Sequence, residues 1–491
     1  MDSALAETAG LAAEALHKHS DNPFNRIIQF ADRYQWVLLA AAAPFLLFPS
    51  PGRSLALLVI PIIFLVSWLA RGEAIPATPL NGSLLLMALM VLVSLWATYD
   101  MGVSLPKVTG ILLGFAVYFT FARYGRRADG LKWTLIALIL TGLAIAGISL
   151  LGTQWTTGKF GALGKITSFF PARLSALVQG GQGFHPNEVA GVLLWVLPVM
   201  ICWVITWLRQ PIAGQMPGTV RKPGSLLRVQ PVAASLATLF VLGVFLLTQS
   251  RTAYLALAIT LFALLWLASS RPWRFVLWGI ALVGLIGLVV LIRQPGGGAE
   301  PRLSLDFQFA QESGQSLVTM EQRLEVWSRA IYAIQDFPLT GMGMNVFRLA
   351  VHRLYPLFLI GPEVDLAHAH NEFLQTALDL GIPGLIAFVA VYLGAFTMLL
   401  RIYRAAPARN ERVPIPAIVL GLGGGLLAHL LYGLVDTVAL GAKPGVVFWM
   451  VLGLIAALYT RLTSGGEAGL TRWGLPGVAR DTSQLPPAGP G

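Results

Sequence analysis

Two histidines of this chain stand where a polar segment meets a long apolar one. The sequence there is His368-Ala-His-Asn, followed by Glu-Phe-Leu-Gln-Thr-Ala-Leu-Asp-Leu-Gly. Imidazole is the side chain best suited to take or give a proton near neutral pH. We therefore expect His368 and His370 to do acid–base chemistry beside a lipid bilayer, although a pair of surface histidines at a membrane boundary would show the same pattern.

Asn371 follows the second histidine and predicts a helix N-cap, because its side chain can accept the free N–H groups of a first turn. The imidazole of His370 would then lie just outside the helix. Glu363 and Asp365 lie upstream, and with the histidines they offer the oxygen and nitrogen ligands that Mn or Zn takes. Nothing in the sequence fixes the geometry of such a site, so a metal remains an alternative.

Three arginines are candidates for binding phosphate, because a planar guanidinium can hold two phosphate oxygens at once. Arg251 lies between two apolar segments, where an unpaired arginine is costly; alternatively, its side chain reaches toward lipid headgroups from a helix end. Arg173 lies in the polar segment Phe169-Phe-Pro-Ala-Arg-Leu-Ser. Arg323 lies on a predicted helix, where a solvated helix face is the alternative.

Other polar residues also border apolar segments. His185 and Asn187 precede one such segment in Gly183-Phe-His-Pro-Asn-Glu-Val-Ala, although Pro-Asn is a common helix start. Asp379 and Asp436 are the acidic residues nearest to the apolar segments. Either of them could orient a histidine or pair with an arginine, and the sequence does not decide between these roles.

The composition is that of a membrane protein. Of the 491 residues, 56% are hydrophobic and only 12% are charged, whereas about a quarter of a soluble domain is charged. We therefore expect the bilayer to be the solvent of most of the chain. The formal net charge is +11, but the basic residues separate apolar segments instead of clustering, so no nucleic-acid partner is expected. The single cysteine, Cys202, lies in an apolar segment as a small hydrophobic residue.

Apolar segments of roughly the 20-residue length that a bilayer requires predict an all-α polytopic membrane protein with about twelve transmembrane helices. They lie near 36–49, 54–70, 83–99, 107–123, 132–151, 188–208, 231–249, 252–270, 273–292, 372–400, 415–435 and 445–462. Lys and Arg concentrate in one alternate set of loops, which places these loops and both termini in the cytoplasm. The first residues lack the pattern of a cleaved signal peptide.

This topology divides the chain into five parts. A cytoplasmic N-terminal segment, 1–34, precedes a region, 35–292, that contains nine transmembrane helices. An external loop, 152–187, lies within this region. A periplasmic loop domain, 293–371, is the one large external loop and separates the ninth and tenth helices. Three further helices occupy 372–462, and a tail rich in Gly and Pro, 463–491, is expected to be disordered in the cytoplasm.

The loop domain contains one clear helical pattern, from about 316 to 335. Its apolar side chains recur at steps of three and four residues; they are Leu317, Met320, Leu324, Trp327, Ile331 and Ile334. The helix could lie along the membrane surface or pack on the core of the loop itself. The glycines of Phe337-Pro-Leu-Thr-Gly-Met-Gly-Met predict a tight turn after it, and we interpret this motif as structural.

Four motifs, taken in order, resemble the O-antigen ligase / O-antigen polymerase superfamily (Wzy_C type) of bacterial inner-membrane proteins, and most of all the ligases. They are Gly183-Phe-His-Pro-Asn-Glu-Val-Ala; Ser250-Arg-Thr-Ala-Tyr-Leu; Arg323-Leu-Glu-Val-Trp with Pro338-Leu-Thr-Gly-Met-Gly; and His370-Asn-Glu-Phe-Leu-Gln with Leu380-Gly-Ile-Pro-Gly-Leu. The resemblance covers roughly residues 180–400 by motif and most of the chain by topology. It also suggests a bend at Leu380-Gly-Ile-Pro-Gly-Leu.

The resemblance implies an inverting, metal-independent glycosyltransferase of the inner membrane without a cofactor, acting on the periplasmic face. Such enzymes take a glycan from undecaprenyl diphosphate. Ligases move it to lipid A–core in lipopolysaccharide biosynthesis, polymerases to another repeat unit, and related oligosaccharyltransferases to protein hydroxyls. The histidine of the family maps to His370, its membrane arginine to Arg251 and a second arginine to Arg173.

The resulting hypothesis makes His370 the general base on the acceptor hydroxyl. The residues expected to bind or orient the lipid diphosphate and glycan are Arg251, Arg173, Arg323, His368, Asn371 and Asn187. A transporter of lipid-linked glycans is the alternative of a different class; it predicts inverted repeats and charges near the bilayer midplane, and no repeat is visible. A metal-dependent glycosyltransferase would need an acidic motif in the first external loop, Pro49-Ser-Pro-Gly-Arg-Ser, which has none.

Overall fold

The computed structural model describes residues 23–50, 52–127, 129–153, 155, 161–167, 184–209, 226–293, 320–405 and 415–464. Within these residues the regular elements are helices, apart from an isolated bridge between Thr153 and Phe184. The predicted all-helical class is therefore confirmed. The predicted cytoplasmic tail lies almost wholly outside the described residues.

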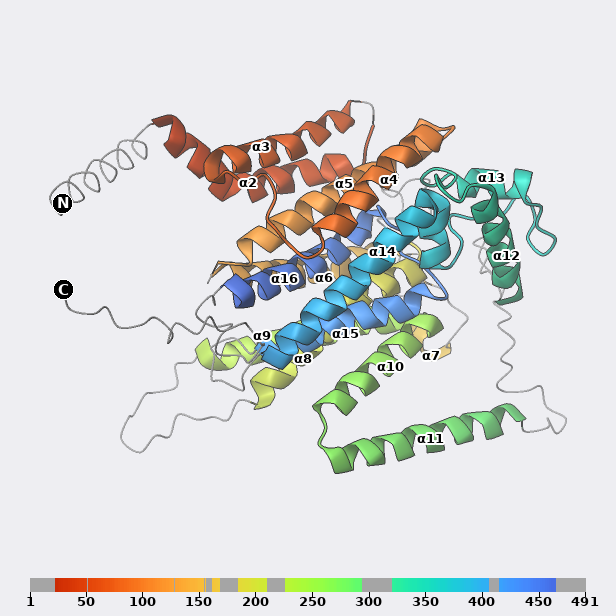
Figure 1. The fold of residues 1–491 in the computed structure, drawn as a ribbon. Helices are drawn as coiled ribbons and strands as arrows, with labels where there is room; N and C mark the ends of the chain where they lie inside the picture. Colours follow the sequence, from red (N-terminus) through yellow and green to blue (C-terminus); the bar gives the residue numbers. More distant parts are fainter. Residues whose placement is uncertain are drawn as a thin grey trace, which may run out of the picture.

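The helices follow one another along the chain (Figure 1). They are α2 (Pro23–Leu47), η1 (Arg53–Leu58), α3 (Val59–Arg71), α4 (Asn81–Ala97), α5 (Met101–Tyr124), α6 (Gly130–Gly152), α7 (Gly161–Thr167), α8 (Pro186–Arg209), α9 (Leu226–Leu247), α10 (Arg251–Ala268), α11 (Arg271–Arg293), α12 (Met320–Asp336), α13 (Phe347–Leu354), α14 (Glu372–Ala405), α15 (Ile415–Gly433), η4 (Lys443–Gly445) and α16 (Val446–Ser464).

Among the described residues, eight helical segments are long and apolar enough to cross a membrane. They are 53–71, 101–124, 130–152, 186–206, 251–268, 372–405, 415–433 and 443–463. Large apolar side chains cover their outer faces and those of their neighbours; Leu85 is 72% exposed and Phe275 is 76% exposed, as expected for side chains that contact lipid. The protein is thus a polytopic membrane protein, while the number of about twelve spans remains a prediction.

The bundle has two distinct ends (Figure 1). Helices α12 and α13 lie at one end, which we call the α12 end. Helix α2 begins and α16 ends at the opposite end, which we call the α2 end. An even number of crossings between α2 and α16 requires this arrangement. That the α12 end faces the periplasm remains a prediction.

Helices α8 and α15 form the closest pair in the centre of the bundle. Glycines on α15 allow this approach, because a side chain on Gly425 would begin 2.4 Å from the backbone oxygen of Trp195. Small residues at helix contacts are the usual device for packing helices in a membrane, where lipid supplies no hydrophobic driving force. The α8–α15 pair therefore forms a rigid base for the loops at the α12 end.

Helix α14 contains the bend that the sequence suggested. Gly381 interrupts the helix with a φ of +70°, a conformation that side chains disfavour, and Pro383 follows it. The turn of the loop domain docks against this bend, since the N–H of Met342 donates to Leu378 over 2.8 Å and the N–H of Ile382 donates to Pro338 over 2.7 Å. The motifs Pro338-Leu-Thr-Gly-Met-Gly and Leu380-Gly-Ile-Pro-Gly-Leu are therefore structural, and their backbones pack against each other.

The loop domain has a small core of its own, under helix α12. The buried face of α12 is formed by Arg323, Val326, Ala330 and Ala333. Leu324 and Ile331, by contrast, are 53% and 46% exposed. The predicted helix is thus confirmed, and it packs on the loop's own core through its small residues, which permit close contact, rather than through its largest apolar ones.

We expect the substitution Gly381→Ala to destabilise the protein. The new Cβ would lie 2.5 Å from the backbone oxygen of Leu339, and the left-handed backbone would cost about 1–3 kcal/mol in addition. Thermal unfolding of the purified protein in detergent measures the loss. Gly147→Ala is the matched control, because no atom lies within 4 Å of its Cβ position on α6; an equal effect of both substitutions would contradict the structural role of Gly381.

Candidate functional site

A single buried carboxylate, that of Asp436, organises the polar residues at the α12 end. Asp436 follows α15 and is 2% exposed. Its two oxygens lie within hydrogen-bonding distance of four donors: Nδ1 of His370 at 3.3 Å, Nδ2 of Asn187 at 3.0 Å, Nη2 of Arg323 at 3.5 Å and the backbone N–H of Thr437 at 3.0 Å. Residues from three distant parts of the chain thus converge on one anion.

These contacts keep the carboxylate ionised. Burial alone would raise the pKa of Asp436, but the hydrogen bond from His370 and the positive charges of His370 and Arg323 hold it well below its usual range. Each carboxylate oxygen has two donors, which matches the capacity of an ionised aspartate. Asp436 is therefore a fixed negative charge directly behind the imidazole of His370.

His370 is held in an unusual backbone conformation with a φ of +49°, which is uncommon for a residue other than glycine. Its side chain is 15% exposed. When the ring is neutral and its Nδ1–H donates to Asp436, the lone pair is on Nε2, which is the atom left to accept a proton from a substrate. The geometry therefore suits a general base whose tautomer is set by a carboxylate.

His368 lies against His370, with the ring centroids 4.5 Å apart and edge to face. Its Nδ1 accepts the backbone N–H of His370 over 3.3 Å. Burial, together with the positive charge of His370, lowers the pKa of His368 well below its usual range. His368 is consequently neutral at physiological pH and acts as an acceptor that stabilises the backbone of its neighbour.

Asn371 caps helix α14, as the sequence predicted. Its Oδ1 accepts the backbone N–H groups of Phe373 and Leu374, each over 3.0 Å, and its Nδ2 donates to the backbone oxygen of Leu434 over 2.9 Å. The cap joins the start of α14 to the segment that follows α15. It therefore fixes His370 relative to Asp436.

A second carboxylate, Asp379, supports the histidine segment from inside the bundle. The side chain of Gln375 accepts the backbone N–H of Ala369 over 2.8 Å and donates to Asp379 over 2.9 Å. Lys107 of α5 pairs with the other oxygen of Asp379 at 3.2 Å. The question that the sequence left open is thus answered: Asp436 contacts both the histidine and an arginine, and Asp379 pairs with a lysine.

A further acid–histidine pair lies deeper in the bundle, and the sequence analysis did not single it out. Glu372 of α14 and His429 of α15 approach to 3.3 Å. The imidazole of His429 stacks on Trp195 with ring centroids 3.9 Å apart, and the hydroxyl of Tyr392 lies 3.3 Å from its Nδ1. An ionisable pair inside apolar helices is costly unless matched, and this pair ties α14 to α15 below the site.

The arginines predicted to bind phosphate occupy different positions. Arg323 is 6% exposed, and its Nη1 donates to the backbone oxygen of Val435 over 2.5 Å, so it lies behind the site. Arg251 is the first residue of α10 and its side chain is exposed; α10 begins at the α12 end (Figure 1). Arg173 lies outside the described residues.

Asn187, near the start of α8, completes the polar cluster. Its Nδ2 contacts Asp436, its backbone oxygen accepts the hydroxyl of Tyr432 over 2.7 Å, and its backbone N–H lies 3.3 Å from Nδ1 of His185. The His185 segment thus repeats a contact of the His368 segment, where the backbone N–H of His370 lies 3.3 Å from Nδ1 of His368. The Asn187 side chain and the His370 ring both contact the same carboxylate.

Of the residues that the sequence suggested for a metal ion, the two histidines lie together, but beside Asp436 and not beside Asp365. Asp365 binds the exposed Arg348 through both of its oxygens. Within the described part of the chain, one group has metal-ligand spacing: atoms of His368, His370 and Asp436 lie within 4.8 Å of one another. The Asp436 oxygens already have four donors in their hydrogen-bonding range, which favours a hydrogen-bonded cluster over a metal site.

Comparison with known families identifies a region that contains part of this site. Residues 236–389 match the family model described as O-antigen ligase (Wzy_C). This segment is an O-antigen ligase family domain. No curated protein matches the chain. The match covers less than half of the chain, and the matched segment lies within a polytopic membrane protein.

The O-antigen ligase domain contains only part of the cluster. Arg251, Arg323 and His370 lie inside the matched residues, whereas Asn187 precedes them and Asp436 follows them. The sequence analysis left the role of Asp436 open between orienting a histidine and pairing with an arginine, and it missed Gln375 and Glu372. One signal for Gln375 was present in the sequence: it stands four residues before Asp379, which places both side chains on the same face of α14. Its contact with the histidine segment became visible only in the fold.

We expect Asp436→Asn to lower glycan transfer by about a hundredfold or more, because the neutral amide can no longer fix the imidazole tautomer or stabilise the imidazolium. Removing the charge also leaves Arg323 buried without its anion, so thermal unfolding must be recorded in parallel. Asp365→Asn, which removes an exposed carboxylate of the loop domain, is the control. A folded Asp436→Asn protein with normal transfer would contradict the role of this carboxylate.

We further expect the protein to lose stability as the pH falls from 7.5 to 5.5, by up to about 1.4 kcal/mol per pH unit for one histidine. The lowered pKa of His368 means that the unfolded chain binds a proton in this range while the folded chain does not. Asp436 contributes only at lower pH, below the ordinary aspartate pKa of about 4. Thermal unfolding of His368→Gln should be less pH-dependent, whereas His352→Gln should behave like the unchanged protein; identical pH profiles for all three would refute this assignment.

Proposed function

We propose that this protein is an inverting glycosyltransferase that moves a glycan from undecaprenyl diphosphate to an acceptor hydroxyl on the periplasmic face. O-antigen ligation to lipid A–core is the preferred reaction. Polymerisation of repeat units and transfer to protein hydroxyls are the alternatives within the same family. The observation that supports the proposal is the contact between Nδ1 of His370 and Asp436, which leaves Nε2 to take a proton. His370 lies within the residues that match the O-antigen ligase family, just before the long membrane helix α14.

In the proposed reaction, Nε2 of His370 accepts the proton of the acceptor hydroxyl. The acceptor oxygen attacks the anomeric carbon from the face opposite the lipid, and the bond between this carbon and the diphosphate oxygen breaks. The products are the glycosylated acceptor and undecaprenyl diphosphate, with inverted configuration at the anomeric carbon. Asp436 stabilises the imidazolium that forms, as a buried carboxylate does behind other catalytic histidines.

Arg251 is the residue that we propose for the lipid diphosphate. Its exposed side chain stands at the start of α10, where a guanidinium can reach the phosphates of a lipid and balance the charge of the leaving group. Arg173 is proposed as a second contact. Arg323 has a different proposed role, because its guanidinium is buried against Val435 and Asp436: it positions the carboxylate from behind.

The remaining polar residues hold the base in place. Asn187 and Asn371 have side chains engaged with Asp436 and with the helix cap, so we propose that they act on the substrate through the geometry of His370. His368 supports the backbone of His370. The donors around Asp436 supply the positive charge that a metal would otherwise provide, and we propose a metal-independent reaction.

The decisive variants are His370→Ala and Arg251→Ala. With purified protein, a lipid-linked glycan donor and acceptor in EDTA, we expect the unchanged protein to form product and each variant to lose about a hundredfold or more, the usual contribution of a general base or charge-stabilising group. His352→Ala and Arg353→Ala, on α13 at the same end, are matched controls. Normal transfer by either decisive variant would overturn its assignment, and loss of activity in EDTA would overturn metal independence.

Gene deletion separates the alternatives within the family. Loss of all long glycan chains on lipid A identifies a ligase, whereas single-repeat chains identify a polymerase. Unchanged lipopolysaccharide with loss of glycan from protein identifies an oligosaccharyltransferase. A transporter of lipid-linked glycans would give no covalent product with purified protein, so the transfer assay also tests this class.

A further inference from the structure

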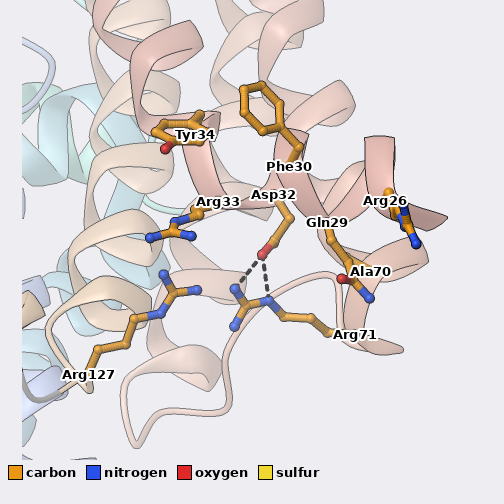
Figure 2. A pocket seen from close by; sticks show the side chains of 9 residues that line it. All are labelled: Arg26, Gln29, Phe30, Asp32, Arg33, Tyr34, Ala70, Arg71 and Arg127. Atoms are coloured by element: carbon orange, nitrogen blue, oxygen red, sulfur yellow. Dashed lines mark hydrogen bonds and ion pairs between the residues drawn. The ribbon is translucent and has the colours of Figure 1, made fainter. Parts of the chain in front are cut away.

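The α2 end of the bundle carries a basic hollow that the proposed reaction does not use. It has a volume of about 790 Å³ and lies between the start of α2, the end of α3 and the turn after α5. Figure 2 shows the side chains that line it: Arg26, Gln29, Phe30, Asp32, Arg33, Tyr34, Ala70, Arg71 and Arg127. Four of these residues are arginines and one is an acid, so the lining is strongly positive.

The carboxylate that lines the hollow is already paired with other residues. Asp32 is 4% exposed, and its Oδ2 accepts from Nε of Arg71 over 2.9 Å. Arg123, which lies behind the hollow, approaches the other oxygen to 3.9 Å. Ser67 is also in contact with this oxygen, at 3.4 Å. Asp32 thus balances Arg71 and Arg123, and it leaves no negative charge for the other arginines of the hollow.

Arg33 and Arg127 have no carboxylate partner within the described part of the chain. Both side chains are exposed. The guanidinium of Arg33 lies 5.9 Å from the ring of Tyr34, and that of Arg127 lies 5.0 Å from the ring of Tyr124. In Figure 2 the two guanidiniums turn toward the same space, beside Arg71. Like charges that face one another are stabilised by an anion between them, and guanidiniums favour phosphate oxygens in particular.

The rim of the hollow is apolar on its outer side. Phe24, Ile27 and Phe30 follow one another along one face of α2 and are 61%, 66% and 65% exposed. Phe30 also lines the hollow, with its ring 4.7 Å from that of Tyr34. Aromatic and apolar side chains beside basic ones are typical of the membrane–water interface. A ligand here therefore meets cations at its head and an apolar surface beside it.

From this combination we propose that the hollow binds the phosphate headgroup of an anionic phospholipid, in the leaflet opposite the His370 site. Its phosphate would contact Arg33 and Arg127, and its acyl chains would lie against Phe30 and Ile27. Because these arginines come from α2 and from the turn after α5, the bound lipid would fasten α2 to the rest of the bundle. The predicted topology places this leaflet on the cytoplasmic side, where anionic lipids attract basic residues.

The proposal is tested with the full-length protein in detergent, by thermal unfolding and by native mass spectrometry after addition of dioleoylphosphatidylglycerol. We expect this lipid to raise the unfolding temperature and to remain bound, since a ligand that binds only the folded state stabilises it. Dioleoylphosphatidylcholine and inorganic phosphate at the same concentrations should do neither. If inorganic phosphate had an equal effect, the ligand of the hollow would be a free anion and not a lipid, and the proposal would be overturned.

The double variant Arg33→Gln/Arg127→Gln leaves the buried Arg71–Asp32 pair intact. We expect it to fold and to bind phosphatidylglycerol about tenfold more weakly, a loss of about 1.4 kcal/mol. Arg271→Gln/Arg404→Gln is the control of equal charge, since both residues are exposed and stand on α11 and α14 at the α2 end. Equal lipid binding by the two double variants would mean that net charge, and not the hollow, attracts the lipid. If the first variant is unstable, Arg127→Gln alone provides the same comparison with Arg404→Gln.

Discussion

The buried charge of Asp436 is the interaction on which the site depends. A carboxylate removed from water is costly unless it is paired and hydrogen-bonded, so the fold must bring donors to it. They come from the start of α8, from α12 and from the segment before α14. One requirement of charge balance therefore sets both the docking of the loop domain on the bundle and the orientation of the His370 ring.

Hydrogen bonds on both sides of His370 explain why this residue tolerates a left-handed backbone. Such strain persists only where the surroundings determine the conformation from several sides. Here His368 accepts the N–H of His370, Gln375 accepts that of Ala369, and Asn371 caps the helix that follows. The pair of Lys107 with Asp379 then anchors Gln375. His370 is thus held in place by hydrogen bonds from the segment that leads into α14 and from Gln375 of α14, which is anchored by a salt bridge to α5.

Local signals in the sequence predicted local structure well. The cap at Asn371, the bend at Gly381 and the helix α12 each depend on residues close together in the chain, so their chemistry is visible without the fold. The convergence on Asp436 was not predictable, because its partners are separated from it by long segments of sequence. The buried face of α12 was also hidden, since alanines make close contacts possible while larger apolar side chains suggest the opposite face. The burial of Arg323 was hidden as well, because its partner Asp436 is brought near only by the fold.

Arginine is used in two opposite ways in this bundle. At the α12 end Arg323 is buried against a carboxylate, and such a pair has a fixed geometry, because any shift exposes an unmatched charge to a low dielectric. At the α2 end Arg33 and Arg127 remain exposed and without a carboxylate among the described residues, so they keep their water and can exchange it for a ligand at little cost. Fixed charge suits a base that must be held still during chemistry. Exchangeable charge suits a surface in contact with lipid, and contact with a buried carboxylate, Asp436 or Asp32, is what separates the two kinds of arginine.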